Sequence, residues 1–227
     1  MSVPSGPALR VPGRGRADGR PWLRGVVHAG MVPVTLAGMW ALLRAASEHG
    51  TAGRVTAGLF GALLVGLYTV SSLYHVPPWP ARVRAVLARL DGAMIQLFIA
   101  GSFTPVAFFT LDGGWRTWSL VGAWVIGITG AVIAASSLQA PRWLGTLGYI
   151  AVGWLTVVPF TRAVAALPWQ GSSLIVLGGV LYTLGAIVYV RRWPDPLPTW
   201  FGYHEIFHLF VVAASVTHYL AIYRYVL

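Results

Sequence analysis

The sequence has 227 residues, of which 56% are hydrophobic and 10% charged, with a mean hydropathy of +0.69 and a formal net charge of +10. This composition excludes an ordinary soluble domain and is typical of a polytopic membrane protein. Cysteine is absent, so disulfides, thiolate nucleophiles and thiolate metal ligands are excluded together, and any bound metal must be held by histidine, carboxylate or water.

The first 24 residues form a distinct amino-terminal segment. It has no apolar run of the length that a secretory signal requires, and its arginines stand among prolines and glycines: Arg10, Arg14, Arg16, Arg20 and Arg24. We interpret residues 1–24 as a disordered basic cytoplasmic tail. Because a membrane span follows at once, the charge of this tail suits anionic lipid, and we expect no nucleic acid as a partner.

Residues 25–227 predict an all-α transmembrane domain. Apolar stretches of about bilayer-spanning length lie near residues 25–46, 54–75, 91–111, 117–138, 143–162, 171–190 and 203–225. The connections between them are short and rich in turn-forming residues, so none leaves room for a second domain. We therefore expect a bundle of seven transmembrane helices.

The arginines are distributed unevenly between the two sides of such a bundle. Eleven of the 16 belong to the tail or to the connections after the second, fourth and sixth spans. The opposite side holds Arg44, Arg54, Arg116, Arg162 and Arg224. Because positive charge is enriched on the cytoplasmic side, we expect a cytoplasmic amino terminus and a multi-pass protein of the cell membrane.

Ionisable residues within the spans are few, and they gather near one side. Ser71 and His75 end the second predicted span, Asp91 begins the third, and His204 and His208 begin the seventh. The end of an even-numbered span and the start of an odd-numbered one face the same side, so these residues should lie at similar depth. Three imidazoles from two helices form a metal site of the kind that leaves a fourth position for water, as in catalytic zinc sites.

The remaining two side chains suit roles beside such a metal. Asp91 could orient a metal-bound water and take its proton, because a carboxylate is a hydrogen-bond acceptor and a base. Ser71 stands one helical turn before His75 and faces the same way, so it could stabilise a developing oxyanion. Ser71 could equally donate a hydrogen bond to its own helix, as serine often does in lipid.

Three motifs closely resemble one known family. They are Ser71-x-x-x-His75, the Asp91 segment that runs into Ile99-Ala-Gly-Ser-Phe-Thr-Pro105, and Gly202-Tyr-His-Glu-Ile-Phe-His208. The resemblance is to the hemolysin III proteins, bacterial members of the progestin and adipoQ receptor family, which is similar in turn to the alkaline ceramidases.

That resemblance implies a seven-helix fold, zinc held by His75, His204 and His208, and contact between Asp91 and zinc-bound water. The ceramidases and the receptor branch imply hydrolysis of lipid amides, whereas the hemolysin name implies cytolysis or pore formation.

The sequence also departs from that family. Gly92 follows Asp91 where the bacterial branch usually has histidine, and Gln96 stands where an aromatic residue is expected. An acidic cluster common before the first span is replaced by Leu23-Arg-Gly25. None of these changes removes a predicted metal ligand, but Gly92 and Gln96 affect the expected substrate contacts near Asp91.

Other interpretations of the same residues remain open. His204-Glu-Ile-Phe-His208 also matches the His-Glu-x-x-His motif of zinc proteases, in which the glutamate, here Glu205, is the general base. That interpretation leaves His75 unexplained. The three histidines could instead be interfacial residues bonded to carbonyls or lipid phosphates. We expect His28, His49 and His218 to be packing or interface residues.

We conclude from the sequence that the chain is a hemolysin III-like membrane protein with a cytoplasmic-side zinc site. Its best enzymatic hypothesis is zinc-dependent, ceramidase-like hydrolysis of a lipid amide or ester, with Asp91 and Ser71 as catalytic residues and a membrane lipid as substrate. The alternative is a non-enzymatic, zinc-stabilised protein that senses lipid, adjusts the membrane or causes cytolysis. The polar residues gather at one depth, which argues against a pore. The sequence does not indicate an oligomeric state.

Overall fold

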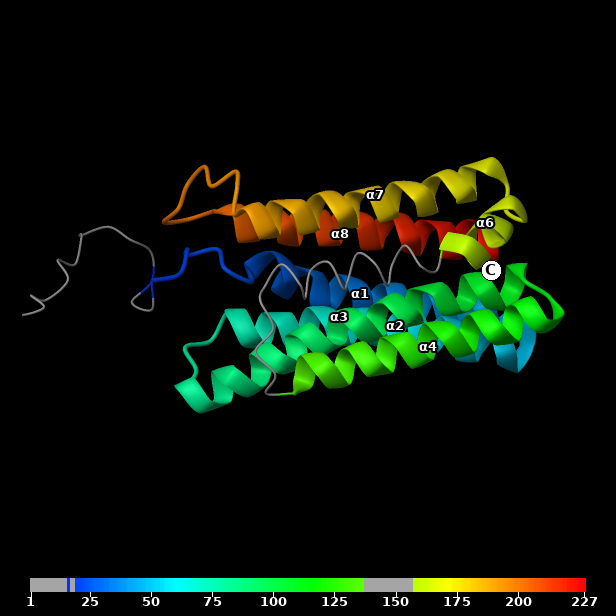
Figure 1. Cartoon of the computed structure of the whole chain (residues 1–227), viewed down its shortest axis with the longest axis horizontal. Coiled ribbons are helices and arrows are strands. Elements are labelled where there is room, and N and C mark those ends of the chain that lie inside the picture. Colours follow the sequence, from blue (N-terminus) through cyan, green and yellow to red (C-terminus); the bar gives the residue numbers. More distant parts are fainter. Residues whose placement is uncertain (1–15, 17–18, 137–156) are drawn as a thin grey trace, which may run out of the picture.

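The computed structural model describes residue 16, residues 19–136 and residues 157–227. Within these ranges the regular structure is helical, as predicted, apart from one isolated bridge between Leu197 and Phe201. The helices are α1 (Val26–Ala45), the 3₁₀ turn η1 (Ala46–His49), α2 (Gly50–His75), α3 (Ala81–Thr110), α4 (Gly113–Ala135), α6 (Val157–Ala165), α7 (Trp169–Arg191), α8 (Tyr203–Ala221) and the π-helical end η2 (Ile222–Val226). The helices lie along a common direction (Figure 1).

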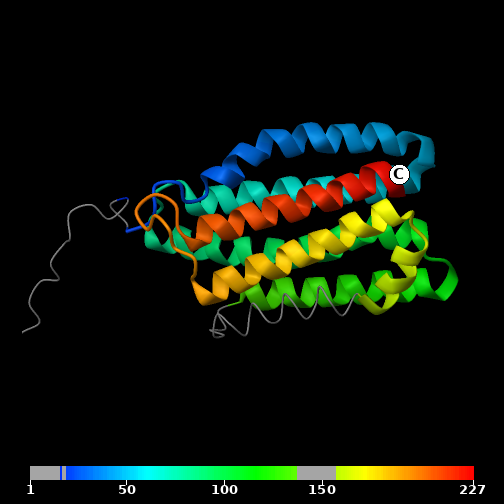
Figure 2. The ribbon, with the colours of Figure 1, turned by 90° about the horizontal axis from the view of Figure 1, so that it is seen from above.

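Five helical segments of the described residues are long and apolar enough to cross a membrane: Val26–His75, Ala81–Thr110, Gly113–Ala135, Trp169–Arg191 and Tyr203–Val226. The first segment spans 50 residues and contains both α1 and α2. The chain reverses at η1, where Gly50 has a φ of 68°, and α2 then packs along α1 (Figure 2). This segment therefore contains two antiparallel helices of 20 and 26 residues, as the sequence predicted.

The third helix begins earlier than predicted. Hydropathy indicated a start near residue 91, whereas α3 begins at Ala81. Its first ten residues are mostly exposed and include Arg82, Arg84 and Arg89. Arginine and alanine favour a helix as well as leucine does, so the helix continues beyond the apolar run. Hydropathy located the apolar part of α3 and missed its polar first turns.

The remaining predicted spans agree with the helices to within a few residues. Residues 117–138 correspond to α4, 171–190 to α7 and 203–225 to α8 with η2. Most of the predicted span at residues 143–162 lies outside the described residues, and α6 covers its end.

Helix α3 lies at the centre of the described bundle. It packs against α2 on one side and α4 on the other. Of its apolar 18-residue stretch, 56% is buried inside the bundle, compared with 17% for the corresponding stretches of α4 and α7. Small residues permit this close packing: Gly101 of α3 lies against Leu63 of α2, and Ala100 lies against Gly127 of α4. Phe60 and Phe98 fill the space between α2 and α3.

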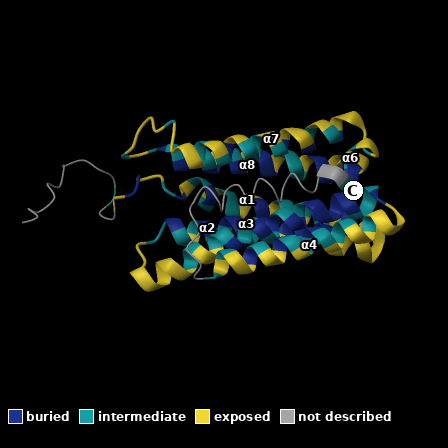
Figure 3. Ribbon diagram, in the orientation of Figure 1, coloured by how far each residue is buried: buried dark blue, intermediate teal, exposed yellow. Residues whose placement is uncertain are grey.

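Apolar side chains also cover the outside of the bundle. The outward faces of α4 and α7 carry exposed residues such as Val125, Ile128 and Val132 on α4 and Val180 and Leu184 on α7. Exposed residues line the outer faces of these helices while buried ones face inward (Figure 3). An apolar outer surface of this extent suits contact with acyl chains and not with water.

The two ends of the bundle differ in charge. The carboxyl end of α2, the amino ends of α3 and α8 and the carboxyl end of α7 lie at one end, together with the first described residues (Figure 1). This end is richer in arginine than the opposite one, which holds Arg44, Arg54, Arg116, Arg162 and Arg224. The carboxyl terminus lies at that opposite end.

Candidate metal centre

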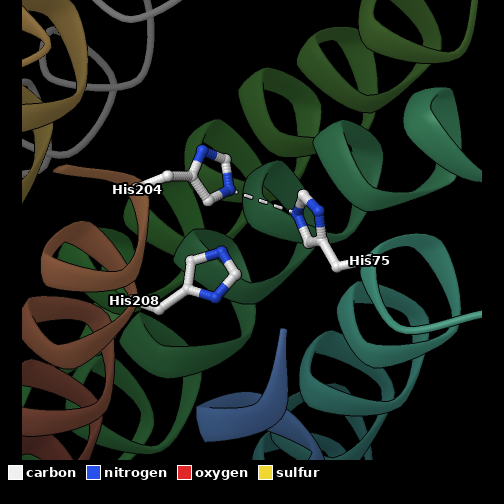
Figure 4. A group of neighbouring side chains, drawn as sticks. All are labelled: His75, His204 and His208. Carbon is white, nitrogen blue, oxygen red and sulfur yellow. Dashed lines mark hydrogen bonds between the residues drawn. The ribbon is translucent and has the colours of Figure 1, made fainter. Parts of the chain in front are cut away.

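Three buried histidines meet at the arginine-rich end of the bundle. His75 is the last residue of α2, while His204 and His208 lie one turn apart in the first turns of α8 (Figure 4). Their exposed fractions are 3%, 7% and 2%. One ring nitrogen from each lies within 4.8 Å of the others, and Nε2 of His75 is 3.2 Å from Nε2 of His204. The fold thus brings together the three predicted ligands, which come from distant parts of the chain.

The geometry of this cluster fits a bound metal ion. Two nitrogens bound to a tetrahedral zinc at about 2.0–2.1 Å stand roughly 3.4 Å apart, close to the 3.2 Å between His75 and His204. An all-nitrogen donor set suits zinc and other transition metals, and it disfavours Mg²⁺ and Ca²⁺, which prefer oxygen. The cluster could therefore hold a transition metal ion.

Asp91 joins the cluster from a third helix. Its Oδ2 lies 3.7 Å from Nε2 of His75, and its side chain is 19% exposed. The Asp91 carboxyl also interacts with the side chain of Ser71, which stands one turn before His75 on α2. The sequence analysis expected these side chains at one depth, and the structure brings them together.

Ser71 faces the site and not its own helix. It is 2% exposed, and its Oγ lies 2.9 Å from Nδ1 of His28. The next residue, Ser72, does bond back to its helix, donating to the carbonyl of Tyr68 at 2.6 Å. Ser71 therefore stands between Asp91 and His28, where its single O–H can donate to only one acceptor.

His28, which the sequence analysis expected to be a packing or interface residue, packs directly against the cluster. It lies in the first turn of α1, is 3% exposed, and stacks on His208 with ring centroids 3.9 Å apart and an interplanar angle of 5°. The start of an odd-numbered span faces the same side as the start of the seventh, so the parity argument applied to His204 would also have indicated His28. His49 and His218 do lie elsewhere, where they bond to the carbonyls of Leu227 and Ile175.

Glu205 is engaged by its neighbours and does not act as a free base. It is 1% exposed; one carboxylate oxygen forms an ion pair with Arg24, and the other accepts a hydrogen bond from the backbone N–H of Gly202 at 2.7 Å. This second contact caps the amino end of α8. Both oxygens are occupied by these two contacts, which weighs against the zinc-protease interpretation of the His-Glu-x-x-His motif.

Comparison with known proteins identifies the family. The model of the family described as haemolysin-III related matches residues 19–219. The chain belongs to the haemolysin III family. It is 36% identical over 185 residues to Hemolysin-3 of Bacillus cereus, covering 80% of each chain. It is 28% identical over 201 residues to the Hemolysin-3 homolog of Bacillus subtilis (strain 168), covering 88% of this chain and 91% of the relative.

A more distant relative supports the predicted link to the receptor family. The chain is 25% identical over 176 residues to the human Monocyte to macrophage differentiation factor, covering 76% of this chain and 71% of the relative. Family membership and the apolar helices together show a multi-pass protein of the cell membrane, as predicted.

Gln96 packs between α3 and α4. It is 6% exposed and points at α4, where a Cβ built on Gly130 would stand 2.6 Å from its amide carbon. Five residues along a helix turn the side chain by about 140°, so Gln96 lies on a different face of α3 from Asp91. Gln96 therefore contributes to the α3–α4 contact and not to the histidine cluster.

Gly25 should be essential for the position of His75. It has a φ of 80°, and a Cβ built on it would stand 2.5 Å from Cβ of His75. We expect Gly25→Ala to lower the melting temperature and weaken metal binding, because the backbone strain costs about 1–2 kcal/mol and the methyl group displaces His75. Thermal unfolding and zinc titration of the detergent-purified protein would measure both effects.

Gly113→Ala is a matched control for this change. Gly113 also has a positive φ, 54°, but a Cβ built there meets nothing within 4 Å. Gly113→Ala should lower the melting temperature through backbone strain and leave the zinc affinity unchanged. Equal zinc affinities in the two variants would contradict a role for Gly25 at the metal centre.

Proposed function

We propose that this haemolysin III protein is a seven-helix, zinc-dependent hydrolase of lipid amide or ester bonds. The observation that carries the proposal is the position of Asp91 beside three buried histidines at one end of an apolar bundle. A purely packed or interfacial set of histidines would have no need of an acidic partner from a third helix.

The seven-helix topology follows from six described helices and one further segment. Helices α1, α2, α3, α4, α7 and α8 each have 19 residues or more. The apolar stretch at residues 143–162, which ends in α6, would supply the remaining span. An odd number of spans agrees with the start of α1 and the carboxyl terminus lying at opposite ends of the bundle. The arginine-rich end that carries the histidines would then face the cytoplasm.

Zinc is the metal that best suits the donor set. Three imidazoles with no thiolate leave a fourth position open, which is the arrangement of catalytic zinc. When bound, zinc would lower the pKa of a coordinated water to about 7 and polarise a substrate carbonyl. His75, His204 and His208 would hold it.

The protein's own side chains would perform the remaining steps. Asp91 would orient the attacking water and accept its proton, since its carboxylate lies 3.7 Å from Nε2 of His75 and is partly exposed. Ser71 would donate its O–H to the oxygen that becomes negative as the carbonyl is attacked. His28, which contacts Ser71 through Nδ1, would hold the hydroxyl in position.

The substrate would be a lipid that enters from the bilayer. The outer faces of the helices are apolar, and the polar site lies at one end of them, so a lipid's acyl chain could remain in an apolar setting while its carbonyl reaches Asp91. The likeness of the family to alkaline ceramidases favours an amide of a long-chain lipid.

A second candidate function is supported by the burial of the site. Three histidines that are at most 7% exposed also suit a structural zinc that ties α2 to α8. The protein would then act without turnover, in lipid sensing, membrane homeostasis or cytolysis. The name of the Bacillus cereus relative, Hemolysin-3, accords with cytolysis.

A lipid hydrolysis assay separates the two functions. Zinc-loaded protein in detergent or vesicles would be incubated with ceramides, other N-acyl lipids and ester lipids, and the released fatty acid measured by mass spectrometry. The hydrolase proposal requires release that stops after chelation and returns with zinc. Absence of release from every lipid by zinc-loaded, folded protein would favour the structural alternative.

Metal removal should lower stability under either function. A ligand that binds only the folded protein stabilises it, by about 2.7 kcal/mol when its free concentration is 100 times its Kd. We therefore expect added zinc to raise the melting temperature of chelator-treated wild-type protein by several degrees. A variant with all three histidines replaced by alanine should show no such shift, and a wild-type protein indifferent to zinc would contradict metal binding.

A further inference from the structure

A short segment before α1 contacts the chain on both sides of the metal centre. Residues 20–25, called the clamp below, run across the arginine-rich end of the bundle. The backbone N–H of Trp22 donates to the carbonyl of Thr199 at 3.0 Å, and that of Leu23 to the carbonyl of Trp200 at 3.1 Å. The clamp is thereby joined to the loop that leads into α8. Residues 20–24 of the clamp fall within the tail defined by the sequence analysis, and they make these specific contacts.

Arg20 joins the clamp to α2. Its side chain is largely buried, and its Nη1 donates to the carbonyl oxygens of His75 at 3.2 Å and Tyr74 at 3.4 Å. Its guanidinium also lies 5.9 Å from the centre of the Tyr74 ring. A cation at the last carbonyls of a helix is stabilising. Because one of these carbonyls belongs to His75, Arg20 holds the backbone of a predicted metal ligand.

Arg24 joins the clamp to α8. It forms an ion pair with Glu205, and the two side chains are only 14% and 1% exposed. Glu205 stands between His204 and His208 in sequence, and its other oxygen caps Gly202. The carboxylate is therefore held from two directions, which fixes the first turn of the helix that carries two ligands.

Arg24 and Glu205 are complementary in charge at a largely buried position. A carboxylate in place of Arg24 would face the buried carboxylate of Glu205 and repel it. Arg24 and Glu205 therefore form a matched pair in this chain.

We propose that the clamp positions the metal centre, with Arg20 and Arg24 as its positioning residues. This inference rests on the proposed binding of zinc by the three histidines. One ligand comes from the end of α2 and two from the start of α8, so affinity depends on how these helix ends are held relative to one another. The clamp contacts both of them through charged side chains that are mostly buried.

Zinc affinity of the full-length protein tests the clamp directly. Protein in detergent would be freed of metal and titrated with zinc against a competing chelator. We expect Arg24→Ala to raise the zinc Kd about 10–100-fold, as loss of a residue that orients a metal ligand commonly does. Arg20→Ala should raise it as well. Arg82→Ala removes an exposed charge at the same end of the bundle and should leave the Kd unchanged.

A double-variant cycle separates positioning from general stability. Arg24→Ala and Glu205→Gln disrupt the same ion pair, so the double variant should bind zinc about as weakly as the weaker single variant. Arg24→Lys, which keeps the charge, should fall between wild type and Arg24→Ala. A merely structural clamp would lower the melting temperature of the zinc-free protein while leaving the zinc Kd unchanged.

The outcomes distinguish the clamp from the proposed function. Wild-type zinc affinity in folded Arg24→Ala and Arg20→Ala would overturn the clamp and leave the zinc site intact. Failure of the wild-type protein to bind zinc would overturn both. If Arg24→Ala does not fold, Arg20→Ala and Arg24→Lys decide the question by the same titration.

Discussion

Replacement of His75, His204 or His208 by alanine is expected to lower zinc affinity by more than about a hundredfold. Each substitution removes one of the three protein ligands. Loss of a ligand should weaken binding more than loss of a residue that only orients a ligand. One ring nitrogen from each of the three histidines lies within 4.8 Å of the others and all three side chains are buried, so loss of one ring would leave the ion only two of these nitrogens. Wild-type protein should carry about one zinc per chain. Elemental analysis of detergent-purified, gel-filtered protein would measure the ratio.

His49→Ala and His218→Ala are the controls for this loss. Both residues bond to backbone carbonyls away from the cluster, so neither variant should lose zinc. His28→Ala is a more informative comparison, because His28 stacks on His208 without belonging to the cluster. It should weaken zinc binding less than removal of a ligand does. Full zinc content in the variant that lacks all three ligands would refute the site.

The sequence allowed the gathering of His75, His204 and His208 at one end of the bundle to be predicted. A helix rises 1.5 Å per residue and a bilayer core is about 30 Å thick, so the position of a residue within a span fixes its depth. Span parity then places His75, Asp91 and His204 on one side. Helical spacing predicts which side chains point the same way, because residues four apart, such as His204 and His208, lie on one face of a helix.

The contacts between distant segments could not be predicted in the same way. The ion pair of Arg24 with Glu205 joins residues 181 positions apart and depends on how α1 and α8 are placed about the bundle axis. Hydropathy carries no information on that placement. For the same reason a basic stretch rich in glycine and proline suggested disorder, although Arg20 and Arg24 each find a specific partner on a helix end.

The contact between His28 and Ser71 was not predicted from the sequence. Each residue taken alone fits a common role for its type in lipid, packing for one and back-bonding for the other. Their contact at 2.9 Å beside His208 and Asp91 gives them a shared environment instead. The histidine cluster thus lies among polar side chains from α1, α2, α3 and α8, each contributed by the end of a helix or its early turns.

Asp91→Asn is expected to reduce lipid hydrolysis by about 10²–10⁴-fold while the protein retains zinc, because the amide keeps the shape of the carboxylate but cannot accept a proton at neutral pH. The three histidines are unchanged, so metal content should stay near that of wild type. The measurement pairs fatty-acid release with elemental analysis on the same preparation. Retained zinc with lost turnover would assign Asp91 to the chemistry and not to metal binding.

Asp112→Asn is the matched control for this substitution. This substitution makes the same carboxylate-to-amide change at the opposite end of the bundle, where the side chain of Asp112 is 96% exposed and paired with Arg116. It should leave both zinc and turnover at wild-type values. If Asp91→Asn released lipid as fast as Asp112→Asn, the catalytic role of Asp91 would be refuted, even with zinc bound. If Asp91→Asn lost zinc together with activity, the carboxylate would belong to the metal-binding set, since its Oδ2 lies only 3.7 Å from Nε2 of His75.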